Sequence, residues 1–264
     1  MGKTNISYAD DILSLCMGCS TSCEVGDRCW AKTWCRRMAA RKGGPRGYPK
    51  DFHKPELFLH RLDKALRWKD LTGTDRPDKP WLNGMPRIIV LNFLGETFDL
   101  ALPEDWLDDR GGHLHLMPPW ARMADSPHIY IILTKQAQRM SEFSRRHPFP
   151  PNVWVGVSVT SDETLWRIEW LLKTKTYGRT IISFEPLLGP IDARSLLGEH
   201  IDLAIIGGES GRNHRLCEVE WIRSLVDQAH AAGVAAFVKQ AAGIHPGLQG
   251  NIPDELWNVK EMPR

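Results

Sequence analysis

Five of the six cysteines in this 264-residue chain fall between positions 16 and 35. Four of them follow the spacing Cys16-x2-Cys19-x3-Cys23-x5-Cys29, and Cys35 comes shortly afterwards. Thiols clustered in this way are typical of metal or iron–sulfur ligation rather than of a disulfide framework. The cysteines are therefore the first candidates for chemistry.

Two kinds of site fit this spacing. Four thiolates can close around a structural zinc ion. Three thiolates on a [4Fe-4S] cluster leave one iron open, and the amino and carboxylate groups of S-adenosylmethionine can chelate that iron. An electron from the cluster then cleaves the cofactor and releases a 5′-deoxyadenosyl radical. Spacing alone leaves both interpretations open.

The elements that position these cysteines are predicted from hydrophobic runs. Six short runs rich in Ile and Val predict buried strands at residues 87–93, 129–133, 153–159, 180–184, 203–206 and 234–238. Amphipathic stretches predict helices at residues 31–41, 55–69, 103–107, 138–145, 162–173 and 218–232. With one more strand before the cysteines, this alternation predicts an α/β fold with a parallel sheet of six or seven βα units. The sheet would form a partial or complete barrel or lie open and doubly wound. Residues 72–84 read as a loop, and residues 1–264 as a single domain.

Polar residues follow each predicted strand, which suggests one shared site because sites of parallel α/β folds lie at the carboxyl ends of strands. The candidates are Gly95, Glu96, Thr97, Thr134, Lys135, Ser158, Thr160, Glu185, Gly207, Gly208, Glu209, Lys239 and Gln240. Some of them also have a structural explanation, and Lys239 could be an ordinary surface lysine. Glu185 could cap a helix or form a salt bridge, Ser158 and Thr160 could merely end a strand, and the glycine pair could form a tight turn.

Charge is unevenly distributed although the net charge is only +2. Residues 31–70 contain 12 Lys and Arg against 4 Asp and Glu, so the block carries +8 and the remainder −6. Such a block suggests a polyanionic partner, and a solvated helix face is the alternative. The sequence contains no Walker A loop, nucleophile elbow or HExxH motif. No apolar run approaches membrane-spanning length, and residues 1–11 lack a signal-peptide pattern, so we expect a cytoplasmic protein without a membrane partner.

Several longer motifs carry a resemblance to known proteins. The chain resembles the radical SAM superfamily and, more closely, a phage-associated three-cysteine family that reads Gly-Cys-x6-Cys-x2-Cys-Tyr-Ala. Gly18-Cys19 and Cys29-Trp30-Ala31 match the two ends of this pattern, with the same number of residues between the first and third cysteines. The middle cysteine is at a different position, Cys23. The further matches are Leu133-Thr134-Lys135, Gly156-Val157-Ser158-Val159, Glu185-Pro186-Leu187-Leu188-Gly189-Pro190-Ile191, Gly207-Gly208-Glu209-Ser210-Gly211 and Val238-Lys239-Gln240.

The resemblance implies a [4Fe-4S] cluster on Cys19, Cys23 and Cys29, with Cys16 as the rival ligand. It implies S-adenosylmethionine bound by strand-end residues, namely Gly95, Glu96, Thr97, Ser158, Thr160, Glu185, Gly207, Gly208 and Glu209. Gly95-Glu96-Thr97 departs from the family's pattern and looks like the superfamily motif that contacts the methionine amino group. Cys35 has no assigned role, and Cys217 reads as a buried packing thiol.

The function implied is modification of a hypermodified thymidine in phage DNA inside the infected cell. An N-linked glycinyl group would be isomerised to a carbon-linked form, and an external donor would supply the electron. The nucleotide would have to leave the duplex to enter a barrel. Two alternatives remain: a radical SAM enzyme acting on a peptide or small molecule, and a non-catalytic nucleic-acid-binding module with a four-cysteine zinc site.

Overall fold

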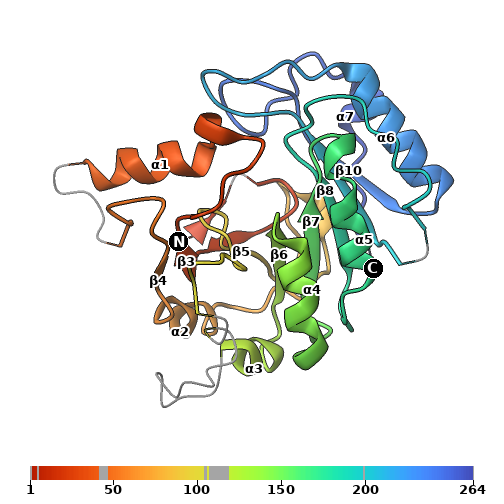
Figure 1. The fold of residues 1–264 in the computed structure, drawn as a ribbon. Coiled ribbons are helices and arrows are strands. Elements are labelled where there is room, and N and C mark those ends of the chain that lie inside the picture. The colour runs from red at the N-terminus through yellow and green to blue at the C-terminus, as the bar shows by residue number, and fades with distance from the viewer. Residues whose placement is uncertain are drawn as a thin grey trace.

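A curved eight-stranded sheet organises the fold in the computed structural model, which describes residues 2–4, 6–41, 47–103, 106, 119–198 and 200–263 (Figure 1). The strands lie in the order β1 (Gly2–Lys3), β2 (Asp11–Leu13), β5 (Ile88–Leu91), β6 (Ile129–Thr134), β7 (Val153–Ser158), β8 (Thr180–Phe184), β9 (Leu203–Gly207) and β10 (Ala235–Gln240). The seven strands from β2 onward are all parallel, and β1 pairs antiparallel to β2 at one edge. The sheet curls into a half-barrel, which confirms the predicted partial barrel.

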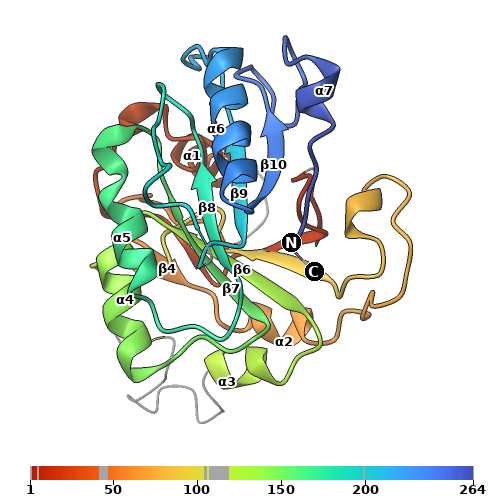
Figure 2. The same ribbon diagram turned by 90° about the vertical axis from the view of Figure 1, so that its right-hand side faces the viewer.

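Both faces of the sheet are buried, because successive strand residues alternate between two apolar clusters. On β5, Ile89 and Leu91 pack outward against the helices, whereas Ile88 and Val90 face the concave side. Helices α4 (Ala137–Arg146), α5 (Trp166–Leu172) and α6 (Val219–Ala231) cover the outer face (Figure 2).

The half-barrel stays open because its first and last parallel strands do not pair with each other. β1 covers the free edge of β2. The free edge of β10 is covered near the C-terminus, where the Val238 amide donates to the Val259 carbonyl at 2.9 Å and the Glu261 amide donates to the Ala236 carbonyl at 3.0 Å. Covered edges protect a sheet from pairing with other chains.

The remaining elements are short. Strands β3 (Cys16–Met17) and β4 (Glu56–Leu57) form a separate antiparallel pair, and α1 (Trp30–Ala39) lies between them in the chain. The remaining helices of the described residues are α2 (Arg61–Ala65), α3 (Pro119–Ala124) and α7 (Asp254–Trp257). Single 3-10 turns form at Gly26–Arg28, Pro80–Leu82 and Asp162–Thr164. No helix among the described residues is long and apolar enough to cross a membrane.

All six predicted strands form, one with the predicted bounds and five with ends shifted by one or two residues. The helix predicted over residues 55–69 is wrong over its first half. There the Phe58 amide donates to the Leu15 carbonyl at 2.7 Å, and Leu57 pairs with Cys16, so β3 holds this backbone in an extended form. The helix predicted over residues 103–107 falls largely outside the described residues.

Candidate functional site

The segment from Gly18 to Cys29, which we call the cysteine loop, is fastened across the carboxyl ends of the parallel strands. Its first anchor is the end of β5. The Gly18 amide donates to the Leu94 carbonyl at 3.0 Å, and the Glu96 amide donates to the Gly18 carbonyl at 3.2 Å. A Cβ atom on Gly95 would lie 3.0 Å from the carbonyl oxygens of Cys16 and Gly18. Glycine at position 95 therefore lets the loop lie directly against the strand end.

The second anchor is Asp99, which is fully buried. Its carboxylate accepts hydrogen bonds from the Ser20 amide at 2.7 Å and from the Ser20 hydroxyl at 2.5 Å. Bonds to an ionised acceptor are stronger than neutral ones. Asp99 thus holds the loop next to Cys19.

The third anchor is Glu24, which reaches the end of β7. Arg167 donates to both oxygens of the Glu24 carboxylate, at 2.9 and 3.1 Å, and Thr160 donates to it at 3.1 Å. Burial acts to raise the pKa of Glu24, but the hydrogen bonds from Arg167 and the positive charges of Lys135 and Arg167 together outweigh it and hold the pKa at about 2. Arg215, in the loop after β9, also donates to the Glu24 carbonyl at 3.4 Å. The cysteine loop therefore spans the ends of β5, β7 and β9.

The three cysteines of the loop carry free thiols. Cys19, Cys23 and Cys29 are each half-buried and form no disulfide. Burial raises the pKa of Cys19 to about 11, so binding of a metal or cluster at this thiol would release a proton.

Cys16, the rival ligand, is fully buried in β3, where its thiol donates to the Glu96 carbonyl at 3.5 Å. Cys35 lies on the buried face of α1 and packs in a small apolar cluster with Met17, Phe52 and Leu94. Cys217 is also buried and belongs to the main apolar cluster, as a packing thiol would.

No three His, Cys, Asp or Glu side chains of the described residues converge closely enough to hold one metal ion. A single zinc ion needs all its ligands in one coordination sphere, with sulfur at about 2.3 Å. Each cysteine of a cluster instead binds a different iron, so cluster ligands lie farther apart. Three free thiols on one anchored loop are donors of the chemical kind that iron–sulfur clusters take.

Glu96 is buried against the cysteine loop and has several hydrogen-bond donors. Its carboxylate accepts from the Thr134 hydroxyl at 2.6 Å, the Lys135 amide at 3.0 Å and the Phe98 amide at 3.1 Å. Burial raises the pKa of Glu96 despite these bonds. Glu96 thus ties the end of β5 to the end of β6. The neighbouring Thr97 is also buried, and its hydroxyl accepts from the Asn92 amide group at 2.9 Å.

Glu185 and Lys239 form an ion pair of 2.7 Å in which both side chains are nearly buried. The lysine ammonium lies 5.7 Å from the ring centre of Tyr8 and 5.8 Å from that of Phe93. The salt bridge that the sequence left as an alternative for Glu185 is therefore present. Lys239 is a buried residue rather than a surface lysine.

The glycine pair after β9 allows the chain to approach itself closely. A Cβ atom on Gly207 would lie 2.8 Å from the Glu185 carboxylate, and one on Gly208 would lie 2.3 Å from the Ala242 nitrogen. Glu209 follows and forms a bidentate ion pair with Arg215, whose nitrogens donate to it at 2.6 and 2.9 Å. Burial acts to raise the pKa of Glu209, but the hydrogen bonds from Arg215 and the charges of Arg215 and Arg28 together outweigh it and lower the pKa.

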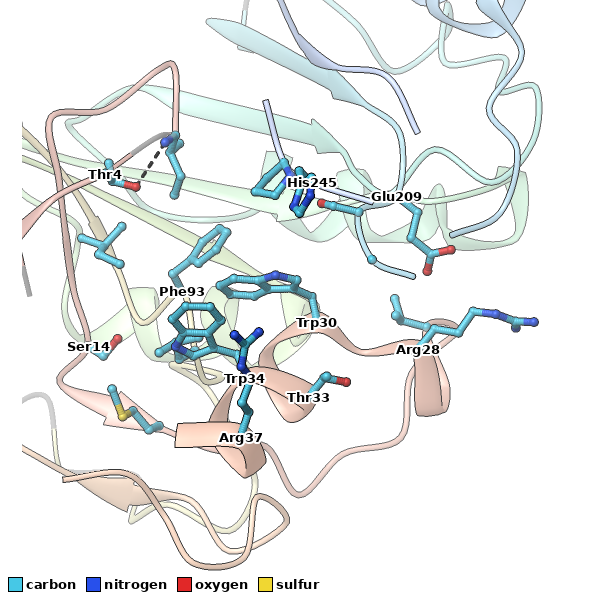
Figure 3. Close-up of a pocket in the computed structure, with 18 of the residues that line it drawn as sticks. Thr4, Ser14, Arg28, Trp30, Thr33, Trp34, Arg37, Phe93, Glu209 and His245 are labelled. Carbon is cyan, nitrogen blue, oxygen red and sulfur yellow. Dashed lines mark hydrogen bonds between the residues drawn. The ribbon is translucent and has the colours of Figure 1, made fainter. Parts of the chain in front are cut away.

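A cavity of about 2320 Å³ occupies the open side of the half-barrel (Figure 3). It is lined by Ile12 of β2 and by Lys239 and Gln240 of β10, so it lies between the two strands that fail to close the barrel. The cysteine loop from Glu24 onward and the first turns of α1 form another wall. Figure 3 shows Trp30, Trp34 and Phe93 together on one side, with Glu209 and His245 across from them.

The structure brings the predicted residues to one end of the sheet, but only some of them lie at the cavity. Of the nine predicted cofactor residues, Glu209 lines this cavity. Gly95, Glu96 and Thr160 contact the cysteine loop, and Glu96 and Thr160 are used for hydrogen bonds within the chain. Glu185, Gly207 and Gly208 instead lie against β10 and the residue Ala242 that follows it.

The aromatic residues of the cavity were not singled out from the sequence. Trp30 and Trp34 stack at 5.5 Å with an interplanar angle of 17°, and Phe93 meets Trp30 edge-on at 5.2 Å. The available signal was their spacing, because residues four apart share a helix face. The sequence did not show whether that face would meet a cavity or the core.

Comparison with known proteins identifies a family but no characterised relative. Neither the curated proteins nor the solved structures contain a match to this chain. The family described as "Protein of unknown function (DUF5131)" matches residues 3–251, which is most of the sequence, and the chain therefore belongs to this family.

Proposed function

We propose that this protein is a radical S-adenosylmethionine enzyme that modifies a base in DNA. One observation carries the proposal: a loop with three free, half-buried thiols is fastened across the carboxyl ends of a parallel half-barrel, directly against Gly95 and Glu96. Sites of parallel α/β folds lie at this end of the strands.

In this proposal Cys19, Cys23 and Cys29 hold a [4Fe-4S] cluster. When bound, the cluster and S-adenosylmethionine supply a 5′-deoxyadenosyl radical that abstracts a hydrogen atom from the substrate. Glu96 would accept a hydrogen bond from the cofactor's amino group. A carboxylate offers about four acceptor positions, and three donors of this chain use Glu96.

The proposed substrate is a thymidine that carries an amino acid on its 5-methyl carbon, converted from a nitrogen-linked to a carbon-linked isomer. This part rests on the sequence resemblance. The exposed arginines of α1, among them Arg36 and Arg37, support a polyanionic substrate because phosphate contacts dominate DNA affinity. An external protein or reductant would supply the electron.

The first test is anaerobic reconstitution with iron and sulfide. We expect a broad visible absorption and, with reductant, conversion of S-adenosylmethionine to 5′-deoxyadenosine. Cys19→Ala, Cys23→Ala and Cys29→Ala should each lose the absorption, and Cys217→Ala should retain it. Zinc uptake without a visible chromophore would instead support the zinc module.

The second test concerns the substrate. Reconstituted protein, reductant and S-adenosylmethionine are incubated with modified phage DNA. The DNA is then digested, and its nucleosides are separated by chromatography and identified by mass spectrometry. An isomerase should produce a nucleoside of unchanged mass and altered retention time. Cofactor cleavage with every DNA nucleoside unchanged would point to a peptide or small-molecule substrate.

A further inference from the structure

We propose that the cavity at the open side of the half-barrel receives a single base extruded from duplex DNA. Trp34 provides the stacking surface, and Ile244 enters the duplex in place of the extruded base. This inference rests on the proposed function, because it takes DNA as the substrate, and it identifies the residues that would open the duplex.

The aromatic wall, defined as Trp30, Trp34 and Phe93, suits a planar ligand. The two indoles are stacked, and Phe93 braces Trp30 from the side. The Arg37 guanidinium lies 5.9 Å from the Trp34 ring centre. Aromatic side chains with nearby arginines bind bases of any sequence by their π faces.

The charges around the cavity favour an anion. Each carboxylate among its lining residues has a cationic partner within the chain: Glu24 with Arg167, Asp27 with Lys32, and Glu209 with Arg215. Three exposed arginines also line it, and within the described part of the chain none of them has an ion-pair partner: Arg28, Arg37 and Arg212. The lining is therefore net positive at its rim, as contact with phosphates requires.

Ile244 is an exposed apolar side chain at the edge of this cavity. It is 57% exposed although it lines the cavity, and it lies in the loop after β10. The loop is held in place, since the Gly243 amide donates to the Glu209 carbonyl and the Gly247 amide donates to the Gln240 side chain, both at 3.0 Å. Proteins that unstack DNA insert such apolar side chains between base steps.

The size and position of the cavity fit a nucleotide that is still attached to DNA. Sites for small molecules usually measure about 300–1,000 Å³, whereas this cavity measures about 2320 Å³. It opens where the sheet does not close, so a base could enter while its strand stays outside. Extrusion is least costly when the base is already unpaired.

The test compares two duplexes that differ at one pair, a matched T·A and a mismatched T·T. Affinity is measured on the full-length protein by fluorescence anisotropy, both as purified and after cluster reconstitution. We expect the wild-type protein to bind the mismatched duplex about tenfold more tightly, because no base pair has to be broken.

Trp34→Ala should weaken both complexes about tenfold. Ile244→Ser should weaken the matched complex about tenfold and the mismatched one less than about threefold, since only the matched duplex must be opened.

Matched variants outside the cavity serve as controls. Trp166, 45% exposed on α5, and Leu172, 43% exposed at its end, match the two test positions. Trp166→Ala and Leu172→Ser should leave both affinities within about twofold of wild type. Trp34→Phe should restore most of the affinity that Trp34→Ala loses, which excludes misfolding as the cause.

Each outcome is decisive. Equal affinity of the wild type for both duplexes, or equal effects of Trp34→Ala and Trp166→Ala, would overturn the extrusion site. An unchanged affinity ratio in Ile244→Ser would overturn the role of Ile244. S-adenosylmethionine cleavage is measured in parallel. A protein that prefers the mismatch but never cleaves the cofactor refutes the radical chemistry alone, and one that cleaves it without preferring the mismatch refutes the extrusion site alone.

Discussion

At the scale of single residues, the polar groups near the cysteine loop form hydrogen bonds that join the strand ends, which their positions in the sequence do not reveal. Glu96 is 8% exposed and accepts three hydrogen bonds from residues at or just after the ends of the neighbouring strands β5 and β6. A carboxylate with this many donors is a structural junction as well as a candidate ligand. Its two roles can be separated by measuring stability without any cofactor.

We predict that Glu96→Gln lowers the free energy of unfolding by about 1–3 kcal/mol. The amide NH₂ group of glutamine cannot accept the hydrogen bonds that one carboxylate oxygen of Glu96 accepts, so buried donors are left without a partner. Urea unfolding of the purified protein measures this difference. Glu142→Gln is the matched control, since Glu142 is exposed and accepts only from Gln138 among the described residues, at 2.9 Å. An unchanged midpoint for Glu96→Gln would show that the junction adds no stability.

His128 provides a pH-dependent prediction. It is fully buried before β6, and burial lowers the pKa of its imidazole below the ordinary value of 6.5. As the pH falls below 6.5, the unfolded chain takes up a proton at His128 more readily than the folded protein does. Stability therefore decreases, by at most about 1.4 kcal/mol per pH unit. The stability lost on acidification should return when the pH is raised again.

The measurement is thermal unfolding between pH 7.5 and 5.5 for wild type and His128→Leu. The variant should lose less stability over this interval, because leucine cannot be protonated. His53→Leu, at an exposed position, should follow the wild-type curve. Parallel curves for wild type and His128→Leu would contradict the prediction.

At the scale of elements, the cysteine loop depends on contacts to the strand ends rather than on regular structure of its own. It contains only the 3-10 turn Gly26–Arg28, and its anchors are Gly95, Asp99 and the Glu24–Arg167 pair. A loop held in this way can bring thiols together only while its anchors remain intact.

We predict that Asp99→Ala increases the rate at which Cys19 reacts with a thiol reagent by roughly 10- to 100-fold. Charge-assisted hydrogen bonds contribute about 1.5–3 kcal/mol each, and their loss makes local opening correspondingly easier. The rate is measured on the metal-free protein, with the modified cysteine identified by peptide mass spectrometry. Asp192→Ala removes an exposed carboxylate that pairs with Arg194 and should not change the rate.

At the scale of the whole molecule, the open half-barrel and the arginines around it define one side of the protein. The basic block of residues 31–70 is not a single surface, however. Arg61 is buried and donates to the carbonyls of Ser14 and Gly47, at 3.0 and 2.8 Å. Arg36, Arg37 and Arg41 are exposed on or just after α1, while Lys42 lies outside the described residues.

We predict that DNA affinity falls steeply with salt. Four phosphate contacts give a slope of log K against log salt of about −3.6, and charge reversal at Arg36, Arg37 and Arg41 should flatten it by about 2.7. Reversal at Arg194, which is exposed on another part of the surface, is the control. A DNA affinity that changes neither with salt nor with these substitutions would argue against a nucleic-acid partner.

The strands and their parallel orientation were predictable because burial on both faces leaves a strong signal in each short run of Ile and Val. The run at 180–184 became β8 with the predicted bounds. The sequence also placed Cys19, Cys23 and Cys29 on one short segment, because their spacing is local. The helix expected over residues 55–69 failed because Leu57 pairs with Cys16, a contact between residues far apart in the chain that no local pattern encodes.

The tertiary structure alone decided how the strand-end residues are used. Sequence placed Glu185, Glu209 and Lys239 after strands, but it did not show that Lys239 pairs with Glu185 or that Arg215 neutralises Glu209. It also did not show that the sheet stops short of closure and leaves a cavity beside Trp30 and Trp34. Periodicity reports which side of an element is buried, whereas ion pairs and cavities depend on the distances between elements, which only the packed chain determines.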